Sequence, residues 1–264
     1  MKTQIITALH KLAVVVLAVG LTVTSADAQT PKKILVVTVT KGFPHSSIPT
    51  AEKVLAKIAE KSGAFTVDYV RNDADMAAKM TAESLKDYDA FVFANTTGVL
   101  PLPDKAAFLN EIKSGKGFVG MHSASDTFHA KEGVDPYTEM LGGEFRTHGA
   151  QVGIECLVQD VKHPAVKNFG ESFCIEREEV YLMKNYDSSR VHELLVLDRH
   201  PNQKNLFGRF AVAWCKKYGQ GNVFYTSLGH REDVWENEAY QKHILGGIKW
   251  ALGLEPGDTK PQMN

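Results

Sequence analysis

The chain has 264 residues, of which 44% are hydrophobic and 23% are charged, and its formal net charge is −1. These values are typical of a soluble globular protein and exclude a disordered chain, a collagen and a coiled coil. Because there is no excess of basic residues to neutralise phosphates, nucleic acid is not expected as a partner. The function must therefore be sought in local groups of residues.

Residues 1–28 have the three parts of an export signal. Two lysines precede or flank an apolar run over residues 12–21, and Ala26-Asp-Ala28 matches the small-residue box that signal peptidases cleave. A membrane anchor is the alternative, but the run has only about half of the roughly 20 apolar residues that a bilayer helix needs. We expect cleavage before Gln29, a periplasmic or secreted protein of net charge −2, and no membrane contact after cleavage.

Three cysteines remain after this cleavage: Cys156, Cys174 and Cys215. An odd number in an oxidising compartment allows at most one internal disulfide, and none of the spacings suits a metal-binding knuckle. We expect these cysteines to serve as small buried hydrophobic residues.

Strand and helix patterns alternate over the first ninety residues after the export signal. Strands are expected at 33–40, 65–70, 88–94 and 117–121, and helices at 48–61, 74–85 and 103–114. The first strand is a near-continuous β-branched run, which is typical of a strand buried on both faces of a parallel sheet. Gly63 is expected to end the first helix. The alternation predicts βαβ units and therefore an α/β core with a doubly wound parallel sheet.

The second half changes to short strand-like segments separated by turns. These segments cover 151–159, 179–183, 193–198, 212–216 and 221–227. They predict an antiparallel extension whose last strand rejoins the main sheet. An amphipathic helix over 237–252 is expected to cover the sheet, and residues 255–264 are expected to form a loose tail. The mature chain is thus interpreted as one domain over 29–254.

Polar residues directly follow several expected strands, at the edge where an open α/β sheet binds its ligands. They are His45, Ser46 and Ser47; Asn95, Thr96 and Thr97; His122, Ser123, Ser125 and Asp126; and Gly229 and His230. Histidine is the side chain best suited to act as acid, base or metal ligand near neutral pH. Packing would explain a single histidine, but three at one edge predict a functional site, and His148 is a fourth candidate in a loop folded over that edge. The remaining histidines are assigned surface or structural roles: His129, His163, His192, His200 and His243.

Nucleophilic catalysis has weak candidates. Ser123 follows a strand and opens a helix-like segment, but it lacks both glycines of the Gly-x-Ser-x-Gly elbow. No cysteine stands at a strand end in the first half.

Metal binding stays open, because no two histidines have the helical spacing of a zinc motif and the ligands would come from distant loops. A catalytic zinc ion uses three protein ligands. The candidates are His45, His122, His148 and His230 together with Asp126 or Glu179. Direct acid–base use of the imidazoles is the alternative, and no other cofactor is expected.

A set of segments in order across nearly all of the mature chain resembles the trehalose-utilisation (ThuA-like) family. They are Gly42–Ser47, Gly117–Thr127, Leu141–Phe145, His163-Pro164, Glu178–Tyr181, Ala213-Trp214 and Tyr218–His230. That family is similar in fold to the class I glutamine amidotransferases, which implies a flavodoxin-like parallel sheet with an antiparallel β extension. The resemblance also implies a role in disaccharide or keto-sugar metabolism, inferred mainly from an association with sugar dehydrogenases.

The resemblance implies a change of chemistry at the amidotransferase site. Those enzymes carry a cysteine at the elbow after a central strand, and a histidine and a glutamate two residues apart late in the chain. Here His122 takes the elbow position, while His230 and Glu232 keep the later spacing. Because no thioester forms without a nucleophilic sulfur, glutaminase activity is not expected. The chain also has His148-Gly149 where the family pattern often reads His-Pro, so this loop is less rigid.

The leading hypothesis is an exported enzyme that acts on a small-molecule sugar or keto-sugar by isomerisation or elimination next to a keto group. His122 and His230 would transfer protons, and Asp126 and Glu179 would orient imidazoles or accept hydroxyl hydrogen bonds. Substrate binding is assigned to His45, Ser46, Asn95, Thr96, Thr97, Ser123 and His148. The alternative is a non-catalytic carbohydrate-binding module on the same fold, which predicts imidazoles that do not contact one another.

Overall fold

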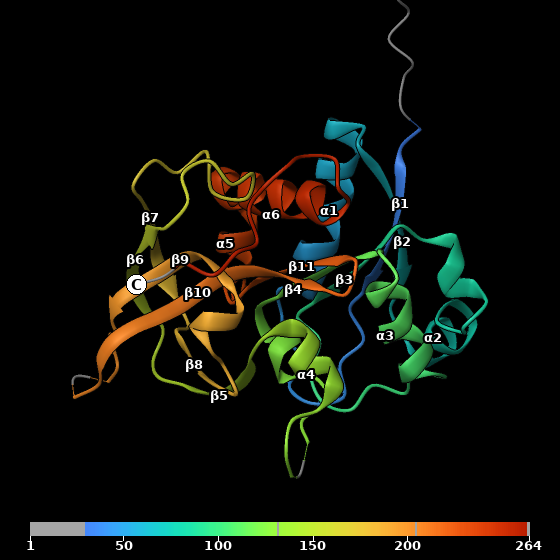
Figure 1. The fold of residues 1–264 in the computed structure, drawn as a ribbon, viewed down its shortest axis with the longest axis horizontal. Helices are drawn as coiled ribbons and strands as arrows, with labels where there is room; N and C mark the ends of the chain where they lie inside the picture. The colour runs from blue at the N-terminus through green and yellow to red at the C-terminus, as the bar shows by residue number, and fades with distance from the viewer. Residues whose placement is uncertain (1–29, 131, 204, 263–264) are drawn as a thin grey trace, which may run out of the picture. The chain divides into compact units, whose positions relative to one another are not determined.

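A mixed β-sheet organises the chain in the computed structural model, which describes residues 30–130, 132–203 and 205–262 (Figure 1). Its nine strands have the order β2-β1-β3-β4-β11-β10-β9-β6-β7. Their bounds are β1 (Lys32–Val37), β2 (Phe65–Val70), β3 (Ala90–Ala94), β4 (Gly117–Met121), β6 (Val152–Val158), β7 (Ser172–Glu178), β9 (His192–Arg199), β10 (Phe207–Tyr218) and β11 (Gly221–Thr226). A separate two-stranded sheet joins β5 (Glu144–His148) to β8 (Tyr181–Lys184). The predicted export signal lies outside the described residues.

The parallel half of the sheet comprises β2, β1, β3, β4 and β11. All five residues of β3 and of β4 are buried. Both faces are covered by α1 (Ile48–Ser62), α2 (Asp73–Lys79), α3 (Lys105–Lys113), α4 (Pro136–Leu141), α5 (Glu232–Glu236) and α6 (Glu238–Ala251), with short 3₁₀ helices η1 (Ser84–Asp87), η2 (His122–Asp126) and η3 (Ser188–Arg190). The predicted doubly wound α/β core is confirmed.

Two hydrophobic cores lie on opposite faces of this sheet. Ile34 and Val36 of β1 pack with α1 and α6, whereas Leu35 and Val37 pack on the other face with α2, α3 and α4. The division follows from the strand itself, because successive side chains of a strand point to opposite faces. Figure 1 shows α1, α5 and α6 together on one side of the sheet. Gly63 ends α1 in the left-handed conformation at φ 59°, as predicted.

The antiparallel extension continues the same sheet. β11 runs parallel to β4 and antiparallel to β10, so the last strand rejoins the main sheet as predicted. Two α-helices, α4 and α5, and two strands, β5 and β7, were not predicted. β7 is an edge strand with charged residues on its exposed face, so it lacks the apolar run by which the inner strands are recognised.

Residues 255–262 are held against the sheet, whereas the sequence predicted a loose tail. The side-chain amide of Gln262 bonds both the backbone N–H and the carbonyl of Glu193 in β9, each at 3.0 Å. His192 Nδ1 donates to the carbonyl of Lys260 at 2.6 Å. These contacts extend the ordered domain past the expected boundary at residue 254.

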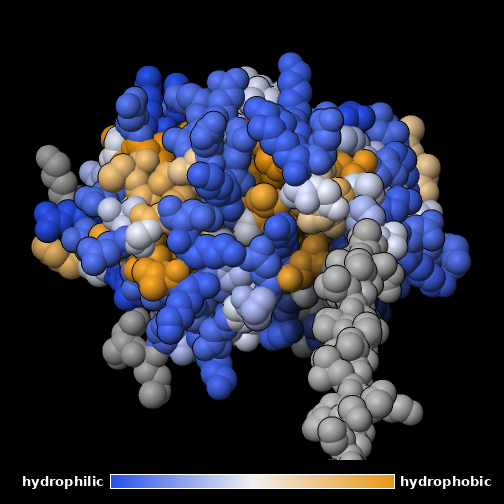
Figure 2. Space-filling model, turned by 90° about the horizontal axis from the view of Figure 1, so that it is seen from above, coloured by the Kyte–Doolittle hydropathy of each residue, from blue (hydrophilic) through white to orange (hydrophobic). Residues whose placement is uncertain are grey.

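The surface is mainly hydrophilic on the face drawn in Figure 2, where hydrophobic residues form small separate patches. Within the described part of the chain, no helix combines the length and the apolar character that a membrane span requires.

All three cysteines are free thiols. Cys156 and Cys215 are buried as predicted, but Cys174 is exposed because it lies on the outer face of β7. Burial raises the pKa of the Cys156 and Cys215 thiols.

These environments predict that one thiol per native chain reacts with Ellman's reagent and that all three react after unfolding. The thiolate is the reactive form, so the two buried thiols are protected by exclusion of the reagent and by their raised pKa. Absorbance of the released thionitrobenzoate gives both counts, and Cys174→Ser serves as the control that removes the native signal. Two or more reactive thiols in the native chain would contradict the assignment.

Candidate functional site

The loops that follow β1, β4 and β11 bring together the three predicted histidines at the carboxyl edge of the parallel strands. His45 follows β1, His122 follows β4 directly, and His230 follows β11. Two neighbouring loops turn sharply at this edge, because Asn95 has φ 55° and His122 has φ 51°. Positive φ is uncommon outside glycine, although asparagine and histidine tolerate it better than most residues. Such strained positions cluster at functional sites.

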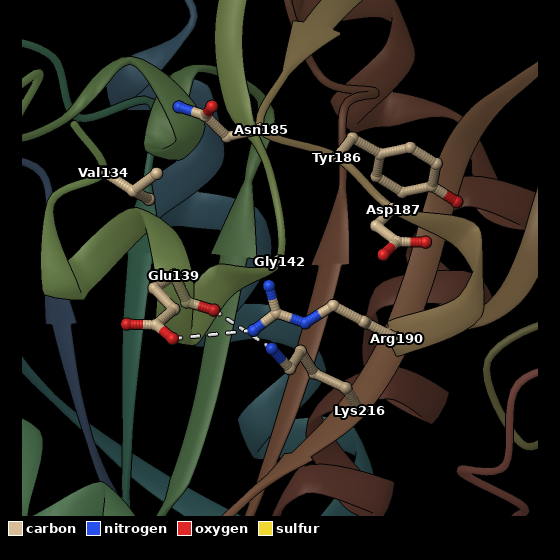
Figure 3. A pocket seen from close by; sticks show the side chains of 8 residues that line it. All are labelled: Val134, Glu139, Gly142, Asn185, Tyr186, Asp187, Arg190 and Lys216. Carbon is tan, nitrogen blue, oxygen red and sulfur yellow. Dashed lines mark hydrogen bonds and ion pairs between the residues drawn. The ribbon is translucent and has the colours of Figure 1, made fainter.

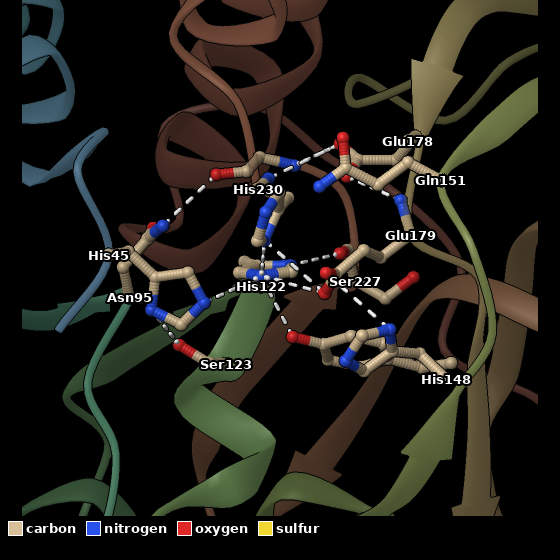
Figure 4. A network of polar contacts seen from close by, with 12 residues as sticks. His45, Asn95, His122, Ser123, His148, Gln151, Glu178, Glu179, Ser227 and His230 are labelled. Atoms are coloured by element: carbon tan, nitrogen blue, oxygen red, sulfur yellow. Dashed lines mark hydrogen bonds and ion pairs between the residues drawn. The ribbon is translucent and has the colours of Figure 1, made fainter. Parts of the chain in front are cut away.

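The three imidazoles meet at His122 (Figure 4). Its Nε2 lies 3.1 Å from Nε2 of His45 and 3.2 Å from Nδ1 of His230. One nitrogen from each ring lies within 4.8 Å of the others. Burial lowers the pKa of His122 well below its ordinary value and lowers that of His45 to about 4. Both rings are therefore neutral at pH 7.

The hydrogen bonds of His122 fix its tautomer. Its Nδ1 lies 2.8 Å from the carbonyl oxygen of Ser227, which can only accept, so Nδ1 donates. Nε2 then carries the lone pair of the neutral ring. The hydroxyl oxygen of Tyr181 lies 2.8 Å from Nε2. Three polar atoms therefore surround this nitrogen: the Tyr181 oxygen and one ring nitrogen each of His45 and His230.

Glu179 is the carboxylate nearest to the cluster. Its oxygens lie 3.2 Å from His230 Nδ1, 3.5 Å from His148 Nδ1 and 3.8 Å from His122 Nε2. Burial opposes ionisation of Glu179, but the hydrogen bond and the charge of His230 bring its pKa below the ordinary value. The same contact raises the pKa of His230 against the effect of its burial. Glu179 and His230 thus form a charge-assisted pair.

Glu178 joins two of the site loops by hydrogen bonds. Its carboxyl group accepts hydrogen bonds from the backbone N–H groups of Glu179 and Gly229, both at 2.8 Å, and of His230 at 3.3 Å. Burial raises the pKa of Glu178 to about 7 in spite of these donors. The side chain is fully buried and therefore positions Glu179 and His230 without reaching a ligand.

A cavity of about 330 Å³ opens above the cluster. It is lined by Phe43, His45, Thr97, Ser123, Asp126, Phe145, His148, Gln151, Glu179, Tyr181 and His230. Three of these residues are aromatic, and the rings of Phe145 and Tyr181 lie 4.5 Å apart. His122 does not line the cavity, because it is fully buried beneath His45 and Tyr181. The volume lies within the usual range for small-molecule sites.

Three further predicted residues line the cavity. Ser123 Oγ lies 3.4 Å from His45 Nδ1, Asp126 pairs with His129 Nε2 at 2.8 Å, and His148 stands at the end of β5 beside Glu179. His129, which the sequence assigned a surface role, thus pairs with one of the predicted carboxylates, and this hydrogen bond raises the pKa of His129.

Three other residues predicted to bind substrate do not line the cavity. Asn95 is buried and its amide donates to Ser47 Oγ and to the carbonyl of Gly229. The hydroxyl of Thr96 is buried against Thr127 at 2.8 Å. Ser46 is exposed and bonds Glu232. Asn95 therefore braces the loops, and Thr97 is the threonine that reaches the cavity.

Sequence reasoning did not assign Tyr181, Phe43, Phe145 or Gln151 to the site. A signal for Tyr181 was present, because Glu179 and Tyr181 stand two residues apart in an expected strand and so share a face. Phe43 and Gln151 lie in loops and Phe145 lies in β5. No local sequence pattern predicts where these segments lie in the fold.

The amidotransferase arrangement of a cysteine beside a histidine and the glutamate two residues after it is not seen at this cluster. Glu232 bonds Ser46, and Glu179 takes the place beside His230 instead. None of the three cysteines is at the cluster: Cys215 Sγ lies 3.6 Å from His163 Nε2, and the others are on β6 and β7.

A second cavity of about 390 Å³ lies between α4 and the residues after β8 (Figure 3). Lys216 Nζ donates to the carbonyl of Glu139 at 3.0 Å, and Arg190 lies 3.5 Å from the Glu139 carboxylate. Its charged groups thus have partners within the fold, and it contains none of the residues that follow the parallel strands. The cavity of about 330 Å³ beside His45 and His230, called the histidine cavity below, is therefore the better candidate for a functional site.

The fold and the polar cluster at its carboxyl edge define a flavodoxin-like α/β protein with an antiparallel extension. The model of the ThuA family, described as trehalose utilisation, matches residues 33–251. The chain belongs to the ThuA family. This confirms the resemblance seen in the sequence.

Solved structures share the fold of this chain. A protein described as ThuA-like from Parabacteroides merdae has a TM-score of 0.69 at 21% identity, covering 84% of this chain and 90% of that one. Another from Bacteroides uniformis has a TM-score of 0.66 at 22% identity, covering 85% and 93%. A β-galactosidase from Bacillus circulans sp. alkalophilus has a TM-score of 0.54 at 12% identity, over 90% of this chain and 33% of that one. At these identities the likeness concerns the fold alone. No curated protein matches the chain.

Proposed function

We propose that the histidine cavity is the active site of an enzyme that isomerises a keto-sugar or eliminates a group from it. The observation that carries this proposal is the convergence of His45, His230 and Glu179 in one cavity, with His122 buried directly beneath them. The family description, trehalose utilisation, supports a sugar derivative as the substrate.

The walls of the cavity suit an uncharged polar ligand. Phe43, Phe145 and Tyr181 offer ring faces against which the C–H groups of a sugar can pack. Thr97, Ser123 and Gln151 supply hydrogen-bonding groups for hydroxyls. Among the described residues, neither lysine nor arginine lines the cavity, which favours a sugar without a phosphate.

The reaction next to a keto group needs a base near the acidic C–H and a positive or donating group near the carbonyl oxygen. Glu179 is the base, since it lines the cavity as a carboxylate. It takes the proton, and the C–H electron pair forms the C=C bond of an enolate whose oxygen is stabilised at the imidazole cluster. The proton of the adjacent hydroxyl moves to the enolate oxygen, and return of the proton from Glu179 to the former carbonyl carbon completes an isomerisation. Loss of a β-oxygen, protonated by His148, completes an elimination.

The buried position of His122 changes the role that the sequence predicted for it. It has no exposed surface in the cavity, so it orients His45, His230 and Tyr181 and does not exchange protons with substrate. A carbohydrate-binding module without catalysis would have no need of imidazoles in mutual contact, so the contacts favour the enzyme.

The test is turnover of keto-disaccharides and of their unoxidised parents, followed by NMR and mass spectrometry. We expect the wild-type chain to convert keto-sugars and the His122→Ala/His230→Ala double variant to lose at least about a hundredfold in rate. Circular dichroism checks that the double variant is folded. If the double variant converted keto-sugars at the wild-type rate, the assignment of the active site would be wrong. Tight sugar binding by the wild-type chain without conversion would favour the binding module.

We further propose that the chain is exported, which predicts a mature N-terminus at Gln29. Expressed with its full sequence in a Gram-negative host, the chain should reach the periplasm or the medium with residues 1–28 removed. Intact-mass spectrometry of each fraction identifies the terminus. Ala28→Lys places a large charged residue at the cleavage site and should leave the precursor uncleaved. An uncleaved wild-type chain confined to the cytoplasm would contradict export.

A further inference from the structure

We infer that His45, His122 and His230 hold a divalent transition-metal ion, and that zinc is the ion best matched to three imidazole donors. The inference deepens the proposed function, on which it rests for the role of the ion, by naming the group that polarises the carbonyl oxygen.

The spacing of the donor nitrogens fits a metal centre. Zinc–nitrogen bonds of 2.0–2.1 Å in a tetrahedron put neighbouring nitrogens about 3.4 Å apart. His122 Nε2 lies 3.1 Å from His45 Nε2 and 3.2 Å from His230 Nδ1, and all three nitrogens lie within 4.8 Å of one another. With the ion in place of the proton that His230 Nδ1 shares with Glu179, rotation of the two outer rings directs all three lone pairs to one point.

Hydrogen bonding alone does not account for the crowding at His122. Its Nδ1 donates to Ser227, so Nε2 has a single lone pair in the ring plane. His45 Nε2, His230 Nδ1 and Tyr181 Oη all lie within 3.2 Å of that atom. One lone pair accepts one well-directed hydrogen bond. A cation at this point gives each imidazole lone pair a partner and leaves the Tyr181 hydroxyl to bond an oxygen on the ion.

The surroundings of the rings are those of a metal site. Metal-binding histidines usually donate their other N–H to a carbonyl or carboxylate, which fixes the tautomer. His122 does so to Ser227 at 2.8 Å, and His45 Nδ1 lies 3.4 Å from Ser123 Oγ. The chain thus supplies oriented ligands from three separate loops.

The fourth coordination position faces the cavity, because His45 and His230 line it and His122 closes the opposite side. Three protein ligands with one open position are the pattern of catalytic zinc. Glu179, 3.2 Å from His230 Nδ1, stands beside that position as the base. A bound ion would act as the Lewis acid for the substrate carbonyl.

Another group of possible ligands nearby is a weaker candidate. Asp126 and Glu144 flank His129, but Glu144 already pairs with Lys184 at 2.8 Å and accepts a hydrogen bond from Asn185 at 3.0 Å. A lysine in contact with the carboxylate competes with a cation.

The experiment titrates zinc into the tag-free mature chain after treatment with a chelator and dialysis. Calorimetry and elemental analysis should give one zinc ion per chain, and cobalt should give the intense visible bands of a tetrahedral site. We expect His45→Ala, His230→Ala and His122→Asn each to weaken zinc binding at least about a hundredfold. Asparagine is chosen at 122 because it tolerates the positive φ of that position. His129→Ala, which removes an imidazole outside the cluster, should bind zinc as the wild type does.

Two results would overturn the inference: a folded chain, checked by circular dichroism, that binds less than one zinc ion, or cluster variants that bind zinc as tightly as the wild type. The outcome is separate from that of the proposed function. Zinc bound at the cluster without any conversion of keto-sugars upholds the metal site and refutes the enzyme. Conversion by a chain that binds no zinc overturns the metal site and leaves the enzyme in place.

Discussion

The Glu179→Gln variant is expected to lose about 10²–10⁴-fold in kcat for keto-sugar conversion, with a much smaller change in KM. The substitution keeps the size of the side chain and removes the negative charge and the basicity. Glu179 lines the cavity and lies 3.2 Å from His230 and 3.5 Å from His148, so it is the carboxylate placed to take a proton from substrate. An amide at this position can still hydrogen-bond hydroxyls, which preserves binding.

The matched control is Glu176→Gln, an exposed glutamate on the neighbouring strand β7. This control also replaces a carboxylate by an amide, but at a residue outside the cavity. It should therefore leave kcat and KM unchanged. Steady-state kinetics with one keto-disaccharide compare the two variants with the wild type. A Glu179→Gln variant with wild-type kcat would remove the carboxylate from the mechanism and with it the proposed base.

At a pH well above the raised pKa of Glu178, where its carboxyl group is charged, the Glu178→Gln variant is expected to lower the free energy of unfolding by about 2–4 kcal/mol. The buried carboxyl group accepts from the N–H groups of Glu179, Gly229 and His230 through both of its oxygens. Glutamine offers one oxygen and one NH₂ group, so at least one backbone donor then faces another donor in the interior. A buried donor left without a partner costs about 1–3 kcal/mol, and hydrogen bonds to charged groups contribute about 1.5–3 kcal/mol.

Urea unfolding followed by circular dichroism measures this change, and Glu176→Gln again supplies the control, with an expected effect within about 0.5 kcal/mol. The loops that carry Glu179 and His230 share these hydrogen bonds, so the variant should also lose activity. Equal stability of Glu178→Gln and the wild type would show that Glu178 does not hold the two loops together.

The inner strands could be predicted closely from the sequence. The expected range 117–121 coincides with β4, an inner strand whose residues are all buried because helices cover both faces of the sheet. The range 65–70 coincides with β2, an edge strand that its alternating apolar and polar residues predict. β5 and β7 escaped prediction since they are polar and belong to the margins of the fold. Residues 255–262 were predicted to be loose, but hydrogen bonds from polar side chains and the backbone hold this tail against β9. Composition does not indicate such hydrogen bonds.

The position of the candidate site follows from topology. Loops after parallel strands meet at one edge, which is why His45, His122 and His230 could be grouped from sequence alone. The direction of each side chain could not be predicted. Thr96 and Thr97 are adjacent, yet one hydroxyl is buried against Thr127 and the other residue lines the cavity.

The role of His122 also needed the tertiary structure. Its place after β4 suggested contact with substrate, but Tyr181 and the other two imidazoles enclose its free nitrogen. Tyr181 arrives from β8, which pairs with β5 outside the main sheet. Only the folded chain brings this strand to the carboxyl edge of the parallel strands.

The most direct measurement of the central claim is deuterium incorporation into a keto-disaccharide in D₂O, followed by proton NMR. The account predicts that the wild-type chain exchanges the C–H next to the carbonyl, and that Glu179→Gln exchanges it at a rate close to that without protein. Binding of the same sugar by the wild-type chain, seen as line broadening, with no exchange of that proton and no product would contradict the assignment of the histidine cavity as an active site.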